Sequence, residues 1–187
     1  MLIEIAIVVV LIVVNGVLAM SELAVVSSRP ARLKAMQEKG SAGAGRALTL
    51  LSNPGRFLST VQIGITLVGV LSGAFSGATL GLRFSEYLLS IGLSQGLAGT
   101  LGVGVVVALI TYASLIIGEL VPKQIALRNP EVVASLVAPG MSLLATVAAP
   151  IVWLLDISGR AVLFLLGQSQ ESDTKVTDEE IRTIIAE

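Results

Sequence analysis

The chain lacks several residue types on which common functional sites depend. It contains no cysteine and no histidine among its 187 residues. Disulfide bonds, thiol chemistry and histidine-based zinc or iron sites are therefore excluded. Charged residues are scarce as well, at 13%, whereas soluble domains carry about 25%. Any metal site must be built from oxygen atoms, which favour hard cations such as Mg²⁺, Ca²⁺ or Na⁺.

The chain is instead rich in apolar residues. Hydrophobic residues make up 54% of it, and its mean hydropathy is +0.91. This composition predicts an integral membrane protein. The net charge is −1 and there is no large basic patch, so nucleic acid is not an expected partner. The first residues, M-L-I-E-I, lack the basic region of a signal peptide and are interpreted as the start of a retained span.

Four apolar stretches organise the sequence, and a weaker amphipathic piece, Tyr87 to Leu93, precedes the third of them. Each of the first three is long enough for the roughly 20 residues that a membrane helix needs. The stretches are Leu2 to Val26, Phe57 to Leu82, Gly96 to Leu120, and Val132 to Leu166.

The charges between these stretches predict the orientation. The link between the first two spans holds one acid, Glu38, and six basic residues: Arg29, Arg32, Lys34, Lys39, Arg46 and Arg56. The next link holds one basic residue, Arg83. The positive-inside rule therefore places the first link in the cytoplasm and the N-terminus outside the cell.

The fourth stretch, Val132 to Leu166, allows two interpretations. Pro139, Pro150, Asp156 and Arg160 are all unfavourable in a single straight span. It could be a kinked fourth crossing, or helices lying along the inner membrane surface. The favoured prediction is an all-α integral membrane fold with three transmembrane helices and a juxtamembrane or re-entrant helical belt.

Residues 168–187 form a polar, acidic tail. The segment T-D-E-E from Thr177 precedes an apolar pattern and resembles a capping box at a helix start. We expect a membrane domain over residues 1–167 and, over residues 168–187, the start of a cytoplasmic linker to a soluble domain. A cytoplasmic C-terminus requires an odd number of crossings, which is the reason for favouring three.

The stretch I-I-G-E-L-V-P-K, from Ile116 to Lys123, is the main candidate for chemistry. A charge in or near a bilayer costs roughly 3 kcal/mol on insertion scales, so Glu119 is expected to be functional. Pro122 has no N–H and should leave the carbonyl of Gly118 without its helical donor. A broken helix with a free carbonyl beside a carboxylate is a plausible cation site. The alternative is a surface ion pair between Glu119 and Lys123, four residues apart.

Other polar residues in the first two spans could complete one oxygen-lined pocket. Each alone is more readily explained by helix packing or by a bond to its own helix. The candidates are Asn15, Ser21, Glu22, Thr66 and Ser72. The second span also carries glycines four residues apart, a pattern that lets helices approach closely in lipid: Gly69, Gly73, Gly77 and Gly81.

Three motifs resemble one known family in order and spacing. They are N-G-V-L-A-M-S-E-L-A from Asn15, Q-I-G-I-T-L-V-G-V-L-S-G-A-F from Gln62, and I-I-G-E-L-V-P-K from Ile116. Together they resemble the membrane domain of the CorC / cyclin M (CNNM) family. The resemblance implies a homodimer in the plasma membrane that exports Mg²⁺ and Co²⁺ by alternating access, coupled to Na⁺ entry. It also implies a cytoplasmic CBS-domain pair that binds ATP, which this chain does not include.

The resemblance further implies an ion held among the first three helices by hydroxyls, backbone carbonyls and the motif glutamate. In this sequence that implies Ser21, the segment around Gly69 and Ser72, and Gly118 with Glu119. Many relatives have asparagine at the position of Gly69, so only a backbone carbonyl is left there.

Two other functions stay open from the residues alone. The chain could be a membrane anchor and dimer scaffold for a regulatory domain, although an anchor needs no intramembrane acid. It could also be an uncoupled Mg²⁺ channel. Catalysis is not indicated, because the sequence shows no paired carboxylates, no nucleophile with a base and no phosphate-binding loop.

Overall fold

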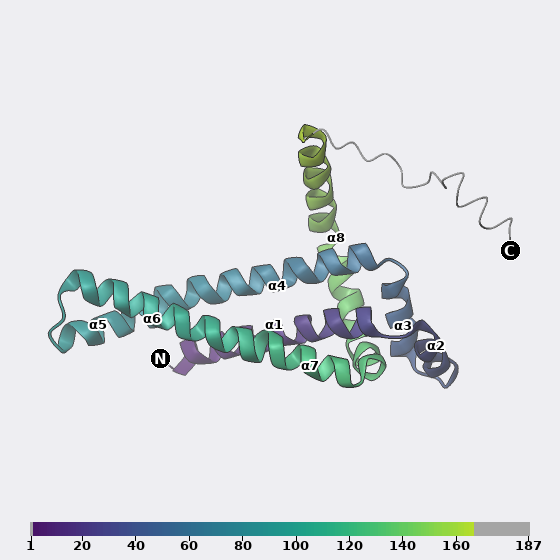
Figure 1. Ribbon diagram of the computed structural model, residues 1–187, viewed down its shortest axis with the longest axis horizontal. Helices are drawn as coiled ribbons and strands as arrows, with labels where there is room; N and C mark the ends of the chain where they lie inside the picture. The colour runs from purple at the N-terminus through teal and green to yellow at the C-terminus, as the bar shows by residue number, and fades with distance from the viewer. Residues whose placement is uncertain (1, 167–187) are drawn as a thin grey trace, which may run out of the picture. The chain divides into compact units, whose positions relative to one another are not determined.

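A computed structural model describes residues 2–166, and every element in this range is a helix (Figure 1). The all-α prediction is confirmed. In chain order the helices are α1 (Leu2–Ser27), α2 (Pro30–Glu38), α3 (Ala42–Leu51), α4 (Pro54–Ser76), α5 (Leu82–Ser90), α6 (Gln95–Leu115), α7 (Val121–Arg128) and α8 (Pro130–Leu165). Two π-helical turns, η1 (Gly77–Gly81) and η2 (Ile116–Leu120), join α4 to α5 and α6 to α7.

The predicted apolar stretches all form helices long enough to cross a bilayer. By length and hydropathy, four candidates stand within the described residues: Leu2–Ser27, Pro54–Ser90, Gln95–Arg128 and Pro130–Leu165. The amphipathic piece expected near Tyr87 is α5, which continues from α4 through η1. The protein is a multi-pass membrane protein, and the number of crossings stays a prediction.

The fourth stretch forms one continuous helix. Pro139 and Pro150 both lie inside α8 without ending it. Proline removes one helical hydrogen bond, and membrane helices tolerate this loss where neighbouring groups compensate. The chain divides into two compact units, Met1–Val152 and Trp153–Glu187, and the boundary falls within this helix.

In the first unit α1 is the central helix. It contacts α4, α7 and η2, while α4 in turn contacts α6. Figure 1 shows α2 and α3 at one end of this bundle and α5 at the other. Alanine supplies six residues of the buried core, and such small side chains allow close helix packing: Ala24, Ala44, Ala47, Ala126, Ala134 and Ala138.

The glycines of the second span divide into two pairs. A Cβ atom at Gly81 would lie 3.1 Å from the Cα of Val103, so this glycine allows close contact with α6. Gly77 lies beside the same helix at ordinary contact distance. At Gly69 and Gly73 a Cβ atom would meet no described atom within 4 Å. Packing within this chain therefore explains the glycines near α5 and not those in the middle of the span.

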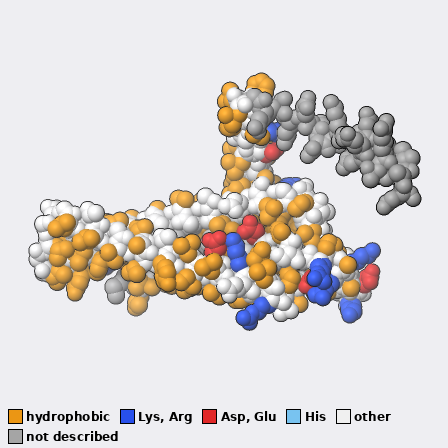
Figure 2. Space-filling model, viewed as in Figure 1, with side chains coloured by type: hydrophobic (Ala, Val, Ile, Leu, Met, Phe, Trp, Pro, Cys, Tyr) orange, Lys and Arg blue, Asp and Glu red, His pale blue; other side chains and the backbone are white. Residues whose placement is uncertain are grey.

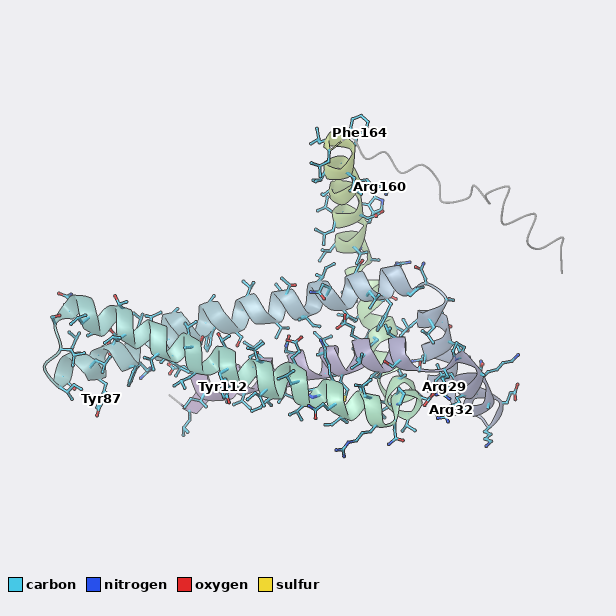
Figure 3. All side chains as sticks on the ribbon, viewed as in Figure 1. Arg29, Arg32, Tyr87, Tyr112, Arg160 and Phe164 are labelled. Carbon is cyan, nitrogen blue, oxygen red and sulfur yellow. The ribbon has the colours of Figure 1, made fainter. Side chains whose placement is uncertain are left out.

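A buried acid joins two corners of the bundle. Glu131, at the start of α8, is only 6% exposed. Its Oε1 accepts a hydrogen bond from the backbone N–H of Arg29 at 3.3 Å, and its Oε2 lies 3.6 Å from Nη1 of Arg32. Figure 3 shows both arginines at the corner between α1 and α2, and Figure 2 shows Lys and Arg side chains gathered over that end. This contact ties the α1–α2 corner to α8, and it was not predicted from the sequence.

The second unit contributes only the end of α8 to the described residues. Most of its side chains are apolar and exposed, including Trp153 and Phe164. Asp156 and Arg160 form an ion pair of 2.6 Å one turn apart. This pairing reduces the cost of two charges in an apolar helix. The predicted linker over residues 168–187, with its capping box at Thr177, lies outside the described residues.

The packing of α3 against α8 generates a stability prediction. A Cβ atom at Gly43 would clash with the backbone oxygen of Ser135. We expect Gly43→Ala to destabilise the chain by about 1–3 kcal/mol, because overpacking against backbone cannot be relieved by a rotamer change. Thermal unfolding of the purified chain in detergent measures this loss.

The matched control is Gly55→Ala. Gly55 also stands second in its helix, and a Cβ atom there would meet no described atom within 4 Å. We expect its unfolding midpoint to stay unchanged or to rise, because alanine is the better helix former. An equal loss of stability in both variants would contradict the close packing of α3 on α8.

Candidate functional site

The third apolar stretch changes helix type at the glutamate motif. Residues Ile116–Leu120 form the π turn η2, and Pro122 stands second in the helix α7 that follows. The expected break at Pro122 is therefore wrong, because the helix continues through the motif. A π turn holds an extra residue, so the chain can accommodate the missing proline donor without stopping the helix. Such turns often occur at functional sites.

The carbonyl of Gly118 has a partner from another helix. Nδ2 of Asn15 in α1 donates to this oxygen at 3.0 Å, and the bond is buried. The prediction of an open carbonyl is thus corrected, since the asparagine amide replaces the helical donor. A Cβ atom at Gly118 would lie 3.3 Å from both Asn15 Nδ2 and the backbone oxygen of Ile12. Glycine at this position lets the π turn approach α1 closely without crowding these atoms.

A second glycine keeps α1 close to the same turn. A Cβ atom at Gly16 would lie 3.0 Å from Cγ of Pro122 and 3.1 Å from the backbone oxygen of Ile117. The segment N-G of the first motif therefore packs directly on the third. The sequence alone indicated Asn15 only as a secondary candidate, whereas Asn15 and Gly16 together make the contact between the two motifs.

Two further α1 candidates lie one to two turns beyond this contact. Ser21 is fully buried, and its hydroxyl donates to the backbone oxygen of Val17 at 2.6 Å. This bond leaves the lone pairs of the serine oxygen able to accept or coordinate. Glu22 follows it and is half-buried.

Glu119 forms the ion pair that the sequence allowed as an alternative. Its Oε1 lies 2.9 Å from Nζ of Lys123, and the two side chains are 41% and 32% exposed. The carboxylate is therefore not fully covered by the described residues, and a divalent cation could compete with the lysine for it.

A pocket of about 160 Å³ opens between α4 and α6. It contains two of the predicted site residues, Gly69 and Ser72, while Thr66 is exposed and is not among its lining residues. Ser21, Gly118 and Glu119 do not line it either. The full lining consists of Gly69, Ser72, Gly73, Ser76, Val107, Ile110, Thr111, Ser114 and Leu115.

Two hydroxyl residues of this pocket, Thr111 and Ser114, were not predicted from the sequence. They lie three residues apart on α6, and Ser114 is one helical turn before Gly118. This spacing places them on one helix face with the motif glycine, so their position beside the motif could have been predicted from the sequence. Ser114 also adjoins the π turn in space, because its Oγ lies 3.4 Å from the position of a Cβ atom at Gly118.

Two buried oxygens near these features lack a hydrogen-bond partner among the described residues: Oδ1 of Asn15 and Oγ of Ser72. Leaving a buried polar group unpaired costs roughly 1–3 kcal/mol. A membrane interior offers no bulk water to reduce that cost. An oxygen atom that is buried, unpaired and next to a pocket is a candidate cation ligand.

The described residues contain no group of three or more acidic side chains that could hold a metal. A cation at this site would therefore be held by neutral oxygens with one nearby carboxylate, Glu119. Neutral oxygens with one carboxylate are ligand types that suit a hard cation.

A family model agrees with the three motifs and extends beyond them. The model described as "Cyclin M transmembrane N-terminal domain" matches residues 6–187, nearly the whole chain.

Curated relatives are similar over almost the same range. The UPF0053 protein sll0260 of Synechocystis is 49% identical over 94% of this chain and 39% of its own length. The UPF0053 inner membrane protein YfjD of Escherichia coli is 31% identical, over 89% of this chain and 36% of its own. A polyamine export protein of Haemophilus influenzae is 28% identical, over 95% and 41%. The chain thus spans about two fifths of the length of these relatives.

The contact between α1 and η2 predicts a stability loss that is specific to Asn15. Replacing Asn15 by leucine leaves the Gly118 carbonyl buried without its donor. We expect Asn15→Leu to lower the free energy of unfolding by about 1–2 kcal/mol, the range for buried polar contacts in membrane bundles. Chemical or thermal unfolding in detergent measures the change.

Ser21→Ala is the control for this prediction. The Ser21 hydroxyl bonds only within its own helix, at Val17, whose backbone oxygen also accepts a helical N–H. Its removal should change stability by a few tenths of a kcal/mol at most. Equal losses of stability in Asn15→Leu and Ser21→Ala would show that the bond from Asn15 to Gly118 contributes no more stability than a bond within one helix.

Proposed function

Because the chain belongs to the cyclin M transmembrane domain family, we propose that it is the membrane domain of a divalent-cation exporter. The proposed cargo is Mg²⁺, with Co²⁺ as a second substrate, and inward movement of Na⁺ supplies the driving force. The proposed location is the plasma membrane, with the N-terminus outside and the C-terminus in the cytoplasm.

The unpaired buried oxygens carry this proposal. Oδ1 of Asn15 sits beside the π turn that presents Gly118 and Glu119, and Oγ of Ser72 lines the adjoining pocket. A buried oxygen that has no hydrogen-bond partner costs free energy, so packing alone does not account for these two atoms. Their presence together with an accessible carboxylate supports a cation-binding role over the membrane-anchor alternative.

The proposed Mg²⁺ ligands are centred on the π turn. Glu119 supplies the negative charge, and Gly118, Asn15 and Ser21 supply neutral oxygens. Mg²⁺ gives up its hydration shell reluctantly, so it should keep several waters unless the ligands are well placed. Lys123 pairs with Glu119 in the structure, and it would hold the carboxylate until the cation displaces it.

Alternating access requires helices that can shift without losing their backbone bonds. The two π turns, η1 and η2, lie in the second and third long helices. A π turn can convert to an α turn by passing its extra residue along the helix, a shift of about one residue. This conversion would move Glu119 relative to α1 and expose the ion to the opposite side of the membrane. An open channel would not require such a movement.

The homodimer is part of the same proposal. In this chain Gly69 and Gly73 contact no described atom at the position of a Cβ. A small-residue face of this kind suits close contact with another membrane helix, so a second copy could pack there.

Mg²⁺ binding by calorimetry tests the site. We expect Glu119→Gln to weaken Mg²⁺ affinity by about tenfold or more, equivalent to at least 1.4 kcal/mol, because it removes the carboxylate charge. Lys123→Gln should keep or strengthen binding, since it removes the competing cation. Glu86→Gln, an exposed carboxylate on α5, is the matched control and should leave binding unchanged.

Transport by the reconstituted chain then separates the competing functions. Saturable Mg²⁺ flux that depends on an opposing Na⁺ gradient supports the exporter, whereas flux independent of Na⁺ supports a channel. A polyamine must be included as competitor, because one relative is named a polyamine export protein. Preference for the polyamine over Mg²⁺, or full Mg²⁺ binding by Glu119→Gln, would refute the proposed site.

A further inference from the structure

Basic side chains gather at the end of the bundle where three long helices end or begin. Arg29 comes directly after α1, Arg56 lies in the first turn of α4, and Arg128 is the last residue of α7. Glu131 follows Arg128 by less than one helical turn and accepts a hydrogen bond from the backbone N–H of Arg29. The ends of α1 and α7 therefore meet here, beside the α2–α3 link (Figure 2).

Most of these cations have no acidic partner within the described part of the chain. The carboxylate of Glu131 contacts Arg29 and Arg32. Glu38, the acid of the α2–α3 link, is exposed and forms no ion pair with a described residue. The remaining basic residues are exposed and likewise form no ion pair with a described residue. They are named the basic platform here: Lys34, Lys39, Arg46, Arg56 and Arg128.

The helices α2 and α3 hold this charge in place, because their other faces are packed. Leu33 of α2 is fully buried, and α3 buries Ala44, Ala47 and Leu50. The two helices contact each other, and α3 also contacts α1 and α4. Ser41 caps α3, since its Oγ accepts a hydrogen bond from the backbone N–H of Ala44 at 3.3 Å. The positive charge is thus carried on the outer surface of two ordered helices.

Exposed apolar side chains lie next to the basic platform. Val26 stands near the end of α1, and Leu127 directly precedes Arg128. On α8, Val132 and Leu136 are exposed one helical turn apart on the same face. A soluble anion would match the charge and leave these apolar side chains in water. A phospholipid matches both features, because its phosphate is joined to acyl chains.

We propose that the basic platform binds the headgroups of anionic phospholipids at this end of the bundle. Clusters of Lys and Arg directly beside a membrane span are typical sites for such lipids. Arg56 and Arg128 stand at the ends of long apolar helices, where basic side chains reach the headgroup region. The neighbouring apolar side chains would contact the first part of the acyl chains.

Lipid bound here would restrain the helix that carries Asn15. The helix α2 follows α1 almost directly, and both α3 and α4 contact α1. Phosphates beside the platform would also reduce the repulsion among its like charges, which opposes the compact state. The lipid is then a ligand of the folded chain and raises its stability. None of these steps involves the transported ion, so the proposal is independent of the export function.

Thermal unfolding of the purified chain in a neutral detergent tests lipid binding. Phosphatidylglycerol is titrated into the micelles and compared with phosphatidylcholine of the same acyl chains, so that only the headgroup differs. Glycerol 3-phosphate at the same ionic strength forms a third arm and represents a soluble phosphate. We expect the unfolding midpoint to rise saturably with phosphatidylglycerol alone. The rise should shrink at high salt, because surface charges are screened.

The main variant combines Lys34→Gln with Arg46→Gln. Both side chains are exposed and form no ion pair with a described residue, so folding should be retained, and the unfolding midpoint in phosphatidylcholine checks this. We expect the apparent affinity for phosphatidylglycerol to fall about tenfold. Lys34→Arg with Arg46→Lys keeps both charges at the same positions and should keep the full response.

Arg83→Gln is the control for loss of positive charge elsewhere. Arg83 lies in α5, at the other end of the bundle from α2 and α3, and pairs with Glu4. This variant should keep its response to phosphatidylglycerol, measured against its own midpoint in phosphatidylcholine.

An equal rise with phosphatidylcholine, or an unchanged response in the glutamine variant, would overturn the proposal. An equal rise with glycerol 3-phosphate would assign the platform to a soluble anion and overturn it too. Loss of the response in the charge-retaining variant would contradict recognition by charge. Mg²⁺ binding by Glu119→Gln is measured separately, so the export function can fail while the lipid response remains, and the reverse.

Discussion

The hydrogen bond between Asn15 and Gly118 is the interaction on which the centre of the bundle depends. Pro122 cannot donate to the helix, and the extra residue of η2 shifts the backbone pattern around Gly118. In an apolar bundle the carbonyl needs another donor, and the buried amide of α1 supplies it at 3.0 Å. The glycines at 16 and 118 make the approach possible. The first and third sequence motifs are thus two halves of one contact.

The same packing arranges the polar groups into two sets. One set surrounds the π turn and contains the only carboxylate of the motif, which is partly exposed and paired with Lys123. The other set consists of neutral hydroxyls between α4 and α6. The carboxylate of the π turn and the hydroxyls between α4 and α6 thus lie in different parts of the bundle.

A contact at the end of the central helix holds this helix in place. Glu131 is buried where α8 begins and bonds to the start of α2, which follows α1 directly. Gly43 lets α3 approach the backbone of α8 around Ser135. Both contacts restrain the end of the helix that carries Asn15 and Ser21. Breaking the bond of a buried acid is costly, since the carboxylate would be left without a partner.

The sequence by itself determined the helical membrane fold and the importance of three motifs. A single apolar segment in lipid must satisfy its backbone hydrogen-bonding groups within itself, and a helix does this. The helices α1, α4 and α6 were therefore predictable from composition and length. Glu119 and its possible partner Lys123 were likewise identifiable, because a pair four residues apart on a helix is local.

Only the tertiary structure decided how residues far apart in the chain meet. A pattern of single spans cannot show that Asn15 reaches Gly118, 103 residues away, or that Pro122 follows a π turn instead of a break. It also could not show that Ser72 shares a pocket with Thr111 and Ser114 and not with Glu119. Such contacts depend on the rotation and spacing of whole helices, which side-chain packing and small residues set collectively and which no local stretch encodes.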